Sequence, residues 1–154
     1  MRIYLPSTFT GLAALLDDGH IGGAPLRAYA VTPHLSGGDR PADDEELEYE
    51  ALRGAARASV RLLAADPAAP RRRAVVAAEI SEAAVAAAPE ADDPAAVTVA
   101  GTVPLKRVAA LHVDAPEAAD AIAAAAADPA AGHDDDHELL WYAVQELPDL
   151  LGRR

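Results

Sequence analysis

The residues with the clearest potential for chemistry are the histidines and acids that cluster toward the C-terminal end of the chain. Positions 133–138 read HDDDHE, and on a helix His133 and His137 would share one face at a spacing of four residues. Two imidazoles and a carboxylate such as that of Asp136 can bind Zn²⁺ or another divalent ion. The sequence therefore offers His133, Asp136 and His137 as candidate metal ligands. The alternative interpretation is a solvated acidic linker that caps the last element.

Three consecutive arginines, Arg71, Arg72 and Arg73, form the second candidate site. Guanidinium groups bind phosphate and carboxylate through paired hydrogen bonds, so these residues are candidates for anion binding. Arg57 and Arg61 would enlarge such a patch if the fold brought them close. The alternative interpretation is a charged strand entrance that deters edge-to-edge pairing.

Other patterns associated with catalysis or cofactor binding are missing from the sequence. No serine lies in a G-x-S-x-G motif, there is no glycine-rich nucleotide-binding motif, and the chain has no cysteine. The acids at positions 43–50 fit the start of a helix, where the macrodipole favours negative charge. We therefore expect no cofactor.

The length and the charge of the chain indicate how many domains it forms and which partners it disfavours. A chain of 154 residues predicts one domain. The 25 acids and 13 bases give a net charge of −12, which disfavours binding to nucleic acid or to an anionic membrane surface. The N-terminus does not read as a signal peptide, and no apolar stretch is long enough to span a bilayer. We expect a soluble cytoplasmic protein.

The elements that must position the candidate residues alternate between helix and strand. The patterns predict strands over 2–5, 26–31, 73–80, 97–103 and 108–113, and helices over 9–16, 44–65 and 116–127. They predict a single α+β domain with a mixed sheet of about five strands packed against helices. The expected order is β-α-β-α-β-β-β-α-α, with the first two crossovers right-handed. Residues 82–93 are alanine-rich and favour helix, although Pro89 and Pro94 interrupt them.

The helix over 44–65 has the clearest periodicity in the chain. Its large apolar residues recur at spacings of three and four and predict one buried stripe that packs onto the sheet. The stripe consists of Tyr49, Leu52, Ala56, Val60 and Leu63.

The C-terminal stretch over 137–147 leaves two structures open. Its leucines fit one face of a helix, which we favour, whereas Trp141 and Tyr142 favour a strand. We expect these two aromatic residues to be buried against the sheet, although aromatic residues also anchor interfaces. His112 lies in a strand pattern and is expected to be a buried neutral histidine.

Three segments together resemble a known family. They are residues 1–6 (MRIYLP), residues 45–49 (EELEY) with residues 55–59 (AARAS) downstream, and residues 137–142 (HELLWY). The chain is similar over nearly its whole length to an uncharacterised actinobacterial family, a domain of unknown function. The resemblance implies no activity, cofactor or site residue.

Three hypotheses for function follow from these observations. The first is a non-catalytic interaction or regulatory module, a homo-oligomer or the binder of a protein partner, because no catalytic constellation is present and alanine-rich helices could pack on a partner. The second is a small enzyme that uses a metal or an acid–base pair from the cluster His133, Asp136, His137 and Glu138. The third is a binder of small anions through Arg71, Arg72 and Arg73.

Overall fold

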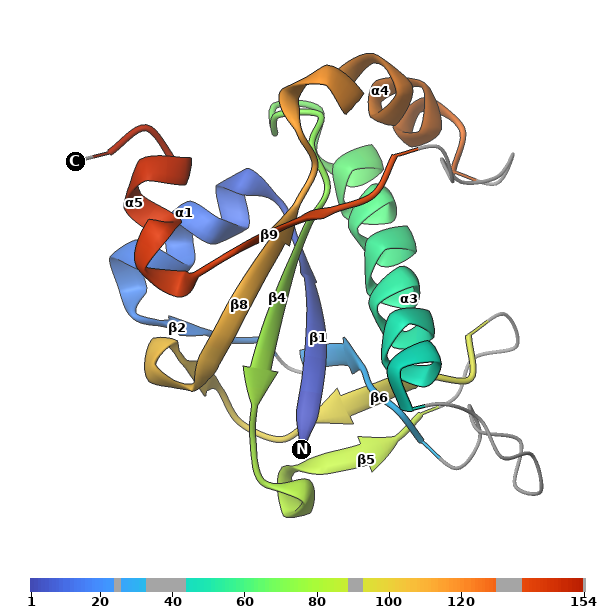
Figure 1. Ribbon diagram of the computed structural model, residues 1–154, viewed down its shortest axis with the longest axis vertical. Coiled ribbons are helices and arrows are strands. Elements are labelled where there is room, and N and C mark those ends of the chain that lie inside the picture. Colours follow the sequence, from blue (N-terminus) through green and yellow to red (C-terminus); the bar gives the residue numbers. More distant parts are fainter. Residues whose placement is uncertain (24–25, 33–43, 89–92, 130–136, 154) are drawn as a thin grey trace.

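The chain folds into a sheet with helices on both of its faces, which confirms the α+β class (Figure 1). The computed structural model describes residues 1–23, 26–32, 44–88, 93–129 and 137–153. Its helices are α1 (Phe9–Asp18), α3 (Asp44–Ala65), α4 (Ala119–Ala127) and α5 (Leu147–Leu150). Short 3₁₀ turns are η1 (Glu82–Ala84), η2 (Leu105–Arg107), η3 (Pro116–Ala118) and η5 (Val144–Glu146).

The main sheet contains seven described strands, in the spatial order β5-β6-β3-β1-β4-β8-β9. They are β1 (Arg2–Ser7), β3 (Leu26–Tyr29), β4 (Ala74–Glu79), β5 (Val85–Ala87), β6 (Ala96–Val99), β8 (Val108–Val113) and β9 (Leu140–Tyr142). A second sheet pairs β2 (His20–Ile21) with β7 (Val103–Pro104).

Every pair of neighbouring described strands is antiparallel, whereas we expected a mixed sheet of about five strands with right-handed crossovers. The alternation of side chains is the same in parallel and antiparallel strands, so the sequence pattern does not encode strand direction. Two short strands at the sheet edges, β5 and β9, account for the difference in number.

The two faces of the sheet carry separate apolar clusters. Strand β4 lies near the middle, and its alternating side chains join both clusters: Val76 packs on the α1 side, and Val75 packs on the α3 side. Covering on both faces explains why residues 74–78 are all small or apolar. Helix α4 adds a third cluster at one end of α3, where Ile122 is buried against Val60 and Leu63.

Helix α3 packs on the sheet through part of the predicted stripe, because Ala56 joins the cluster on the sheet and Leu52 packs against it. Three alanines outside the stripe, Ala51, Ala55 and Ala58, join the same cluster. Alanine side chains let the helix backbone approach the strands closely, and this orientation leaves Tyr49 at the flank. Tyr49 is 48% exposed there, and the prediction that this residue is buried is wrong.

The C-terminal stretch also differs from expectation. Residues 140–142 form strand β9, followed by η5 and the short helix α5, so the favoured helix over 137–147 is wrong and the strand alternative is correct at its centre. Trp141 is 62% exposed and is not buried against the sheet. Residues 82–87 likewise form η1 and β5 instead of a helix.

The start of α1 follows the sequence prediction closely. The Thr8 hydroxyl oxygen accepts a hydrogen bond from the Gly11 backbone N–H at 3.0 Å, as an N-cap residue does.

Within the described parts of the chain, no helix has the length and apolar character that crossing a membrane requires.

Candidate functional site

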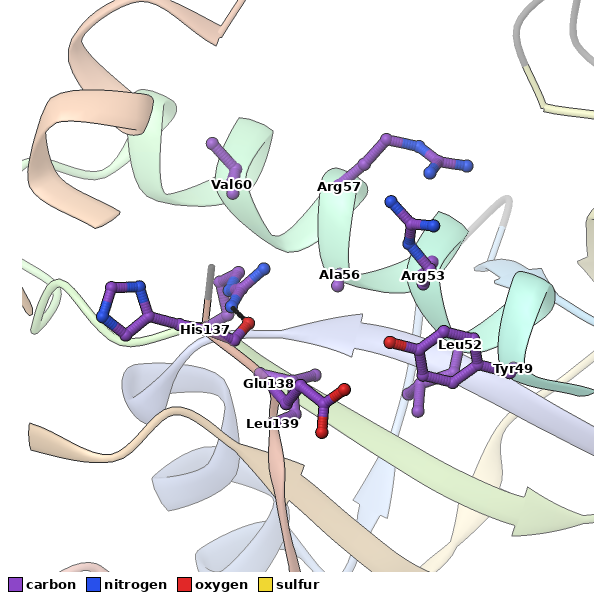
Figure 2. Close-up of a pocket in the computed structure, with 10 residues that line it drawn as sticks. Tyr49, Leu52, Arg53, Ala56, Arg57, Val60, His137, Glu138 and Leu139 are labelled. Atoms are coloured by element: carbon purple, nitrogen blue, oxygen red, sulfur yellow. Dashed lines mark hydrogen bonds between the residues drawn. The ribbon is translucent and has the colours of Figure 1, made fainter. Parts of the chain in front are cut away.

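The candidate site is a groove of about 190 Å³ between α3 and residues 137–139, the segment that leads into β9 (Figure 2). We call residues 137–139 the lead-in segment. The groove combines aliphatic side chains with cationic and other polar ones, and it is lined by Tyr49, Leu52, Arg53, Ala56, Arg57, Val60, Arg73, His137, Glu138 and Leu139.

Four of the lining residues, Tyr49, Leu52, Ala56 and Val60, belong to the stripe that the sequence predicts. Ala56 and Leu52 also contact the apolar cluster on the sheet, so this part of the stripe lies between the sheet and the groove. Leu139 of the lead-in segment packs against the same apolar cluster as Leu52 and lines the other side. The helix thus contributes Tyr49 and Leu52 to a partly open site.

A buried ion pair lies at the base of the lead-in segment. Arg73 is 5% exposed and Asp114 is fully buried. The guanidinium donates from Nε to Oδ2 and from Nη2 to Oδ1, both at 2.8 Å, and the Arg73 backbone N–H also donates to Oδ2 at 2.7 Å. This paired geometry satisfies the charge of the carboxylate in a site without solvent.

Arg73 also holds the lead-in segment in place. Its Nη2 donates a hydrogen bond to the His137 backbone carbonyl at 2.8 Å. The carboxylate of Asp114, at the end of β8, therefore fixes the guanidinium, and the guanidinium fixes the backbone that enters β9. One charge pair positions both the groove wall and the edge strand.

A second arginine–aspartate pair links α3 to the approach to β6. Arg57 Nη2 donates to Asp93 Oδ2 at 3.2 Å, and Asp93 lies just before β6. Gly54 permits this approach, because a Cβ atom at that position would lie 2.6 Å from Asp93 Oδ2 and 2.9 Å from the Tyr29 ring. The glycine in the middle of α3 therefore has a packing reason.

A cluster of titratable groups lies on the face of the sheet that α3 covers. The Tyr4 hydroxyl donates to Glu48 Oε2 at 2.7 Å, and burial together with this bond raises the tyrosine pKa far above its usual value. The His112 ring meets the Tyr4 ring edge-on, with the centroids 6.3 Å apart. Burial lowers the pKa of His112, and the charge of Arg2 lowers it further. Both effects favour the neutral form of the ring.

The three predicted anion-binding arginines point to different places. Arg71 donates to the carbonyls of Leu63, Asp66 and Ala69 at the C-terminal end of α3. Arg72 donates to the Asp114 carbonyl at 2.9 Å and stacks over the Phe9 ring at 4.3 Å, and Arg73 forms the buried pair. Each side chain thus has a contact within the protein, and anion binding by the three stays a prediction.

The predicted metal ligands are described only in part. His133 and Asp136 lie outside the described residues, while His137 is half-buried and lines the groove. Within the described ranges, no three histidine, aspartate or glutamate side chains come together as metal ligands. Metal binding, and the enzyme that would depend on it, remain hypotheses about the segment around residue 133.

Sequence reasoning missed Asp114, Asp93 and Arg53. Asp114 directly follows the apolar run of β8, and a lone acid at the end of a buried strand is the signal that could have identified it. Arg53 and Arg57 are four residues apart on α3, beside the apolar stripe, and that spacing places both on the groove side.

The fold and the groove together define an α+β domain with an arginine-lined groove. The chain belongs to a family of unknown function, DUF6912, whose model matches residues 1–151. A comparison with curated proteins and another with solved structures each found no match. The biochemical role of the family is unknown.

Proposed function

We propose that the domain is a non-catalytic interaction module that associates with a second copy of itself through the edge strand β9. The observation that carries this proposal is the exposure of two large apolar side chains on that strand, 62% for Trp141 and 44% for Leu140. Burying large apolar area is the main driving force of association, and tryptophan is among the residue types enriched at the energetic centre of an interface.

The position of β9 supports strand pairing. Among the described strands, β9 pairs only with β8 and ends the sheet. Natural sheets usually protect such an edge with lysine, proline or a bulge. Residues 139–143 read LLWYA and contain none of these, nor any charged residue.

The strand is also complementary to itself. An antiparallel pair centred on Trp141 would set Trp141 against Trp141 of the second copy, and Leu140 against Tyr142 of the second copy. Each exposed apolar side chain would gain an apolar neighbour, as a two-fold interface requires. Because β9 is only three residues long, the side chains must contribute more than the backbone ladder.

The net charge gives the proposal a second consequence. Two chains of charge −12 repel each other, and salt screens this repulsion over a Debye length of about 10 Å at 0.1 M. Association driven by apolar side chains at β9 should therefore strengthen as the salt concentration rises. An interface built on ion pairs would weaken instead.

Sedimentation velocity over a range of protein concentrations tests the proposal. The variant is Trp141→Lys, and the matched control is Ala86→Lys on β5, an exposed position at the other edge of the sheet. We expect wild type and the control to dimerise, and we expect Trp141→Lys to weaken dimerisation by about 30-fold or more, as for a loss of about 2 kcal/mol at an energetic centre. A wild-type chain that stays monomeric at all concentrations, or equal effects of the two lysines, would contradict the proposal.

A further inference from the structure

The groove between α3 and the lead-in segment has the composition of a small-ligand site. Leu52 and Val60 from the helix and Leu139 from the lead-in segment form its apolar walls. Three guanidinium groups, those of Arg53, Arg57 and Arg73, line it together with one carboxylate, that of Glu138. An apolar cavity with a few convergent polar groups is the usual form of a site for small molecules.

Two of the three guanidinium groups lie on the helix side of the groove. Arg53 and Arg57 lie one turn apart on α3, and Figure 2 shows their guanidinium groups near each other. The bond from Arg57 to Asp93 restricts the guanidinium before any ligand arrives. A restricted guanidinium loses less conformational entropy when it binds a planar anion.

We infer that this groove binds a small monocarboxylate with an apolar body, such as an aromatic or short branched acid. The carboxylate would accept hydrogen bonds from Arg53 and Arg57, and the apolar body would lie among Leu52, Val60 and Leu139. This inference concerns a site separate from the β9 edge and does not depend on self-association.

Size and charge favour this class over larger or more highly charged anions. A volume of about 190 Å³ equals the liquid volume of about six water molecules, which is enough for a single ring or a short chain. A bare phosphate has no apolar part that it could bury against the aliphatic walls. The net charge of −12 repels anions in general, so binding must depend on the local guanidinium groups.

A two-dimensional ¹H–¹⁵N NMR titration of the full chain tests the inference with three probes. Benzoate carries both the charge and the apolar body, benzamide is its neutral isostere, and inorganic phosphate has charge without an apolar body. We expect benzoate at millimolar concentrations to shift the amide signals of Leu52, Val60 and Leu139, and we expect benzamide and phosphate to leave them in place.

The variants Arg53→Gln and Arg57→Gln are each expected to weaken benzoate binding by about tenfold, the effect of losing one charged hydrogen bond. The matched control is Arg107→Gln, an exposed arginine in η2 outside the groove, which should bind as wild type does. Two glutamine variants are used because Arg57 also pairs with Asp93, and Arg53→Gln leaves that pair intact. Benzamide binding equal to benzoate, no shifts with benzoate, or unchanged affinity in both variants would overturn the inference.

Discussion

The two edges of the main sheet differ in the size of the side chains that they expose. Strand β5 at one edge reads VAA, and its exposed positions Ala86 and Ala87 carry only methyl groups. Strand β9 lies at the other edge (Figure 1). It reads LWY and exposes Trp141 and Leu140. The chain has one tryptophan, and the fold places it on an edge where solvent reaches it.

This difference indicates that the rest of the fold holds β9 in a position where its large apolar side chains are exposed. The lead-in segment before β9 is fixed by the buried pair of Arg73 and Asp114, which joins β4 to the end of β8. On the β5 side, the pair of Arg57 and Asp93 fixes the approach to β6, and the edge beyond it ends in alanines. Both sides are therefore held by an arginine–aspartate pair, and only one of them presents a large apolar surface.

The largest expected effect comes from removing the support behind β9. Asp114→Ala leaves the Arg73 guanidinium buried without its partner, which should lower the free energy of unfolding by about 3–5 kcal/mol. Chemical denaturation followed by circular dichroism measures this loss. Asp17→Ala, which removes an exposed pair with Arg153, is the control and should leave the unfolding midpoint almost unchanged. Equal midpoints for the two variants would show that the pair does not hold β9.

A smaller effect is expected on the β5 side. Gly54→Ala places a methyl group where Asp93 and Tyr29 approach α3, and the crowding should exceed the gain in helix propensity, with a net loss of about 1 kcal/mol. Denaturant titration of wild type and variant measures this loss. A more stable variant would mean that propensity dominates and that Asp93 is not held against the helix.

The smallest expected effect is a dependence of stability on pH through His112, the neighbour of Trp141 on β8. His112 lies opposite Trp141 in the β8–β9 register, and burial with the nearby charge of Arg2 lowers its pKa in the folded state. The unfolded chain then binds the proton more readily, so stability is complete above about pH 6.5 and falls as the pH drops below it. Denaturation at pH 7 and pH 5 should show a smaller loss for His112→Gln than for wild type. Equal losses would count against this assignment.

Much of the fold can be predicted from the sequence, because its local signals are strong. The helix that begins at Phe9, the helix over 44–65 and the apolar run of β4 all follow from the periodicity of the sequence. The exposure of Tyr49 could not be predicted in this way, because a pattern of large apolar residues does not reveal how much of the contact with the sheet the alanines make. Strand β9 was ambiguous because leucines fit both periodicities over so short a stretch.

The site was harder to predict than the fold, because its residues are distant in sequence. Arg73, Asp114 and His137 meet only through the order of strands β4 and β8 and the entry to β9. The run of three arginines drew attention to anion binding as a group, whereas the fold sends Arg71, Arg72 and Arg73 to separate partners. Strand order is a tertiary property that local patterns do not contain.

The fluorescence of the single tryptophan tests the central claim most directly, because Trp141 itself is the proposed contact. Emission and acrylamide quenching are measured from nanomolar to high micromolar protein, with a neutral quencher chosen because the chain carries a charge of −12. Burial between two copies predicts a shift of the emission to shorter wavelength and weaker quenching as the concentration rises. Emission at long wavelength with full quenching at every concentration would contradict the account.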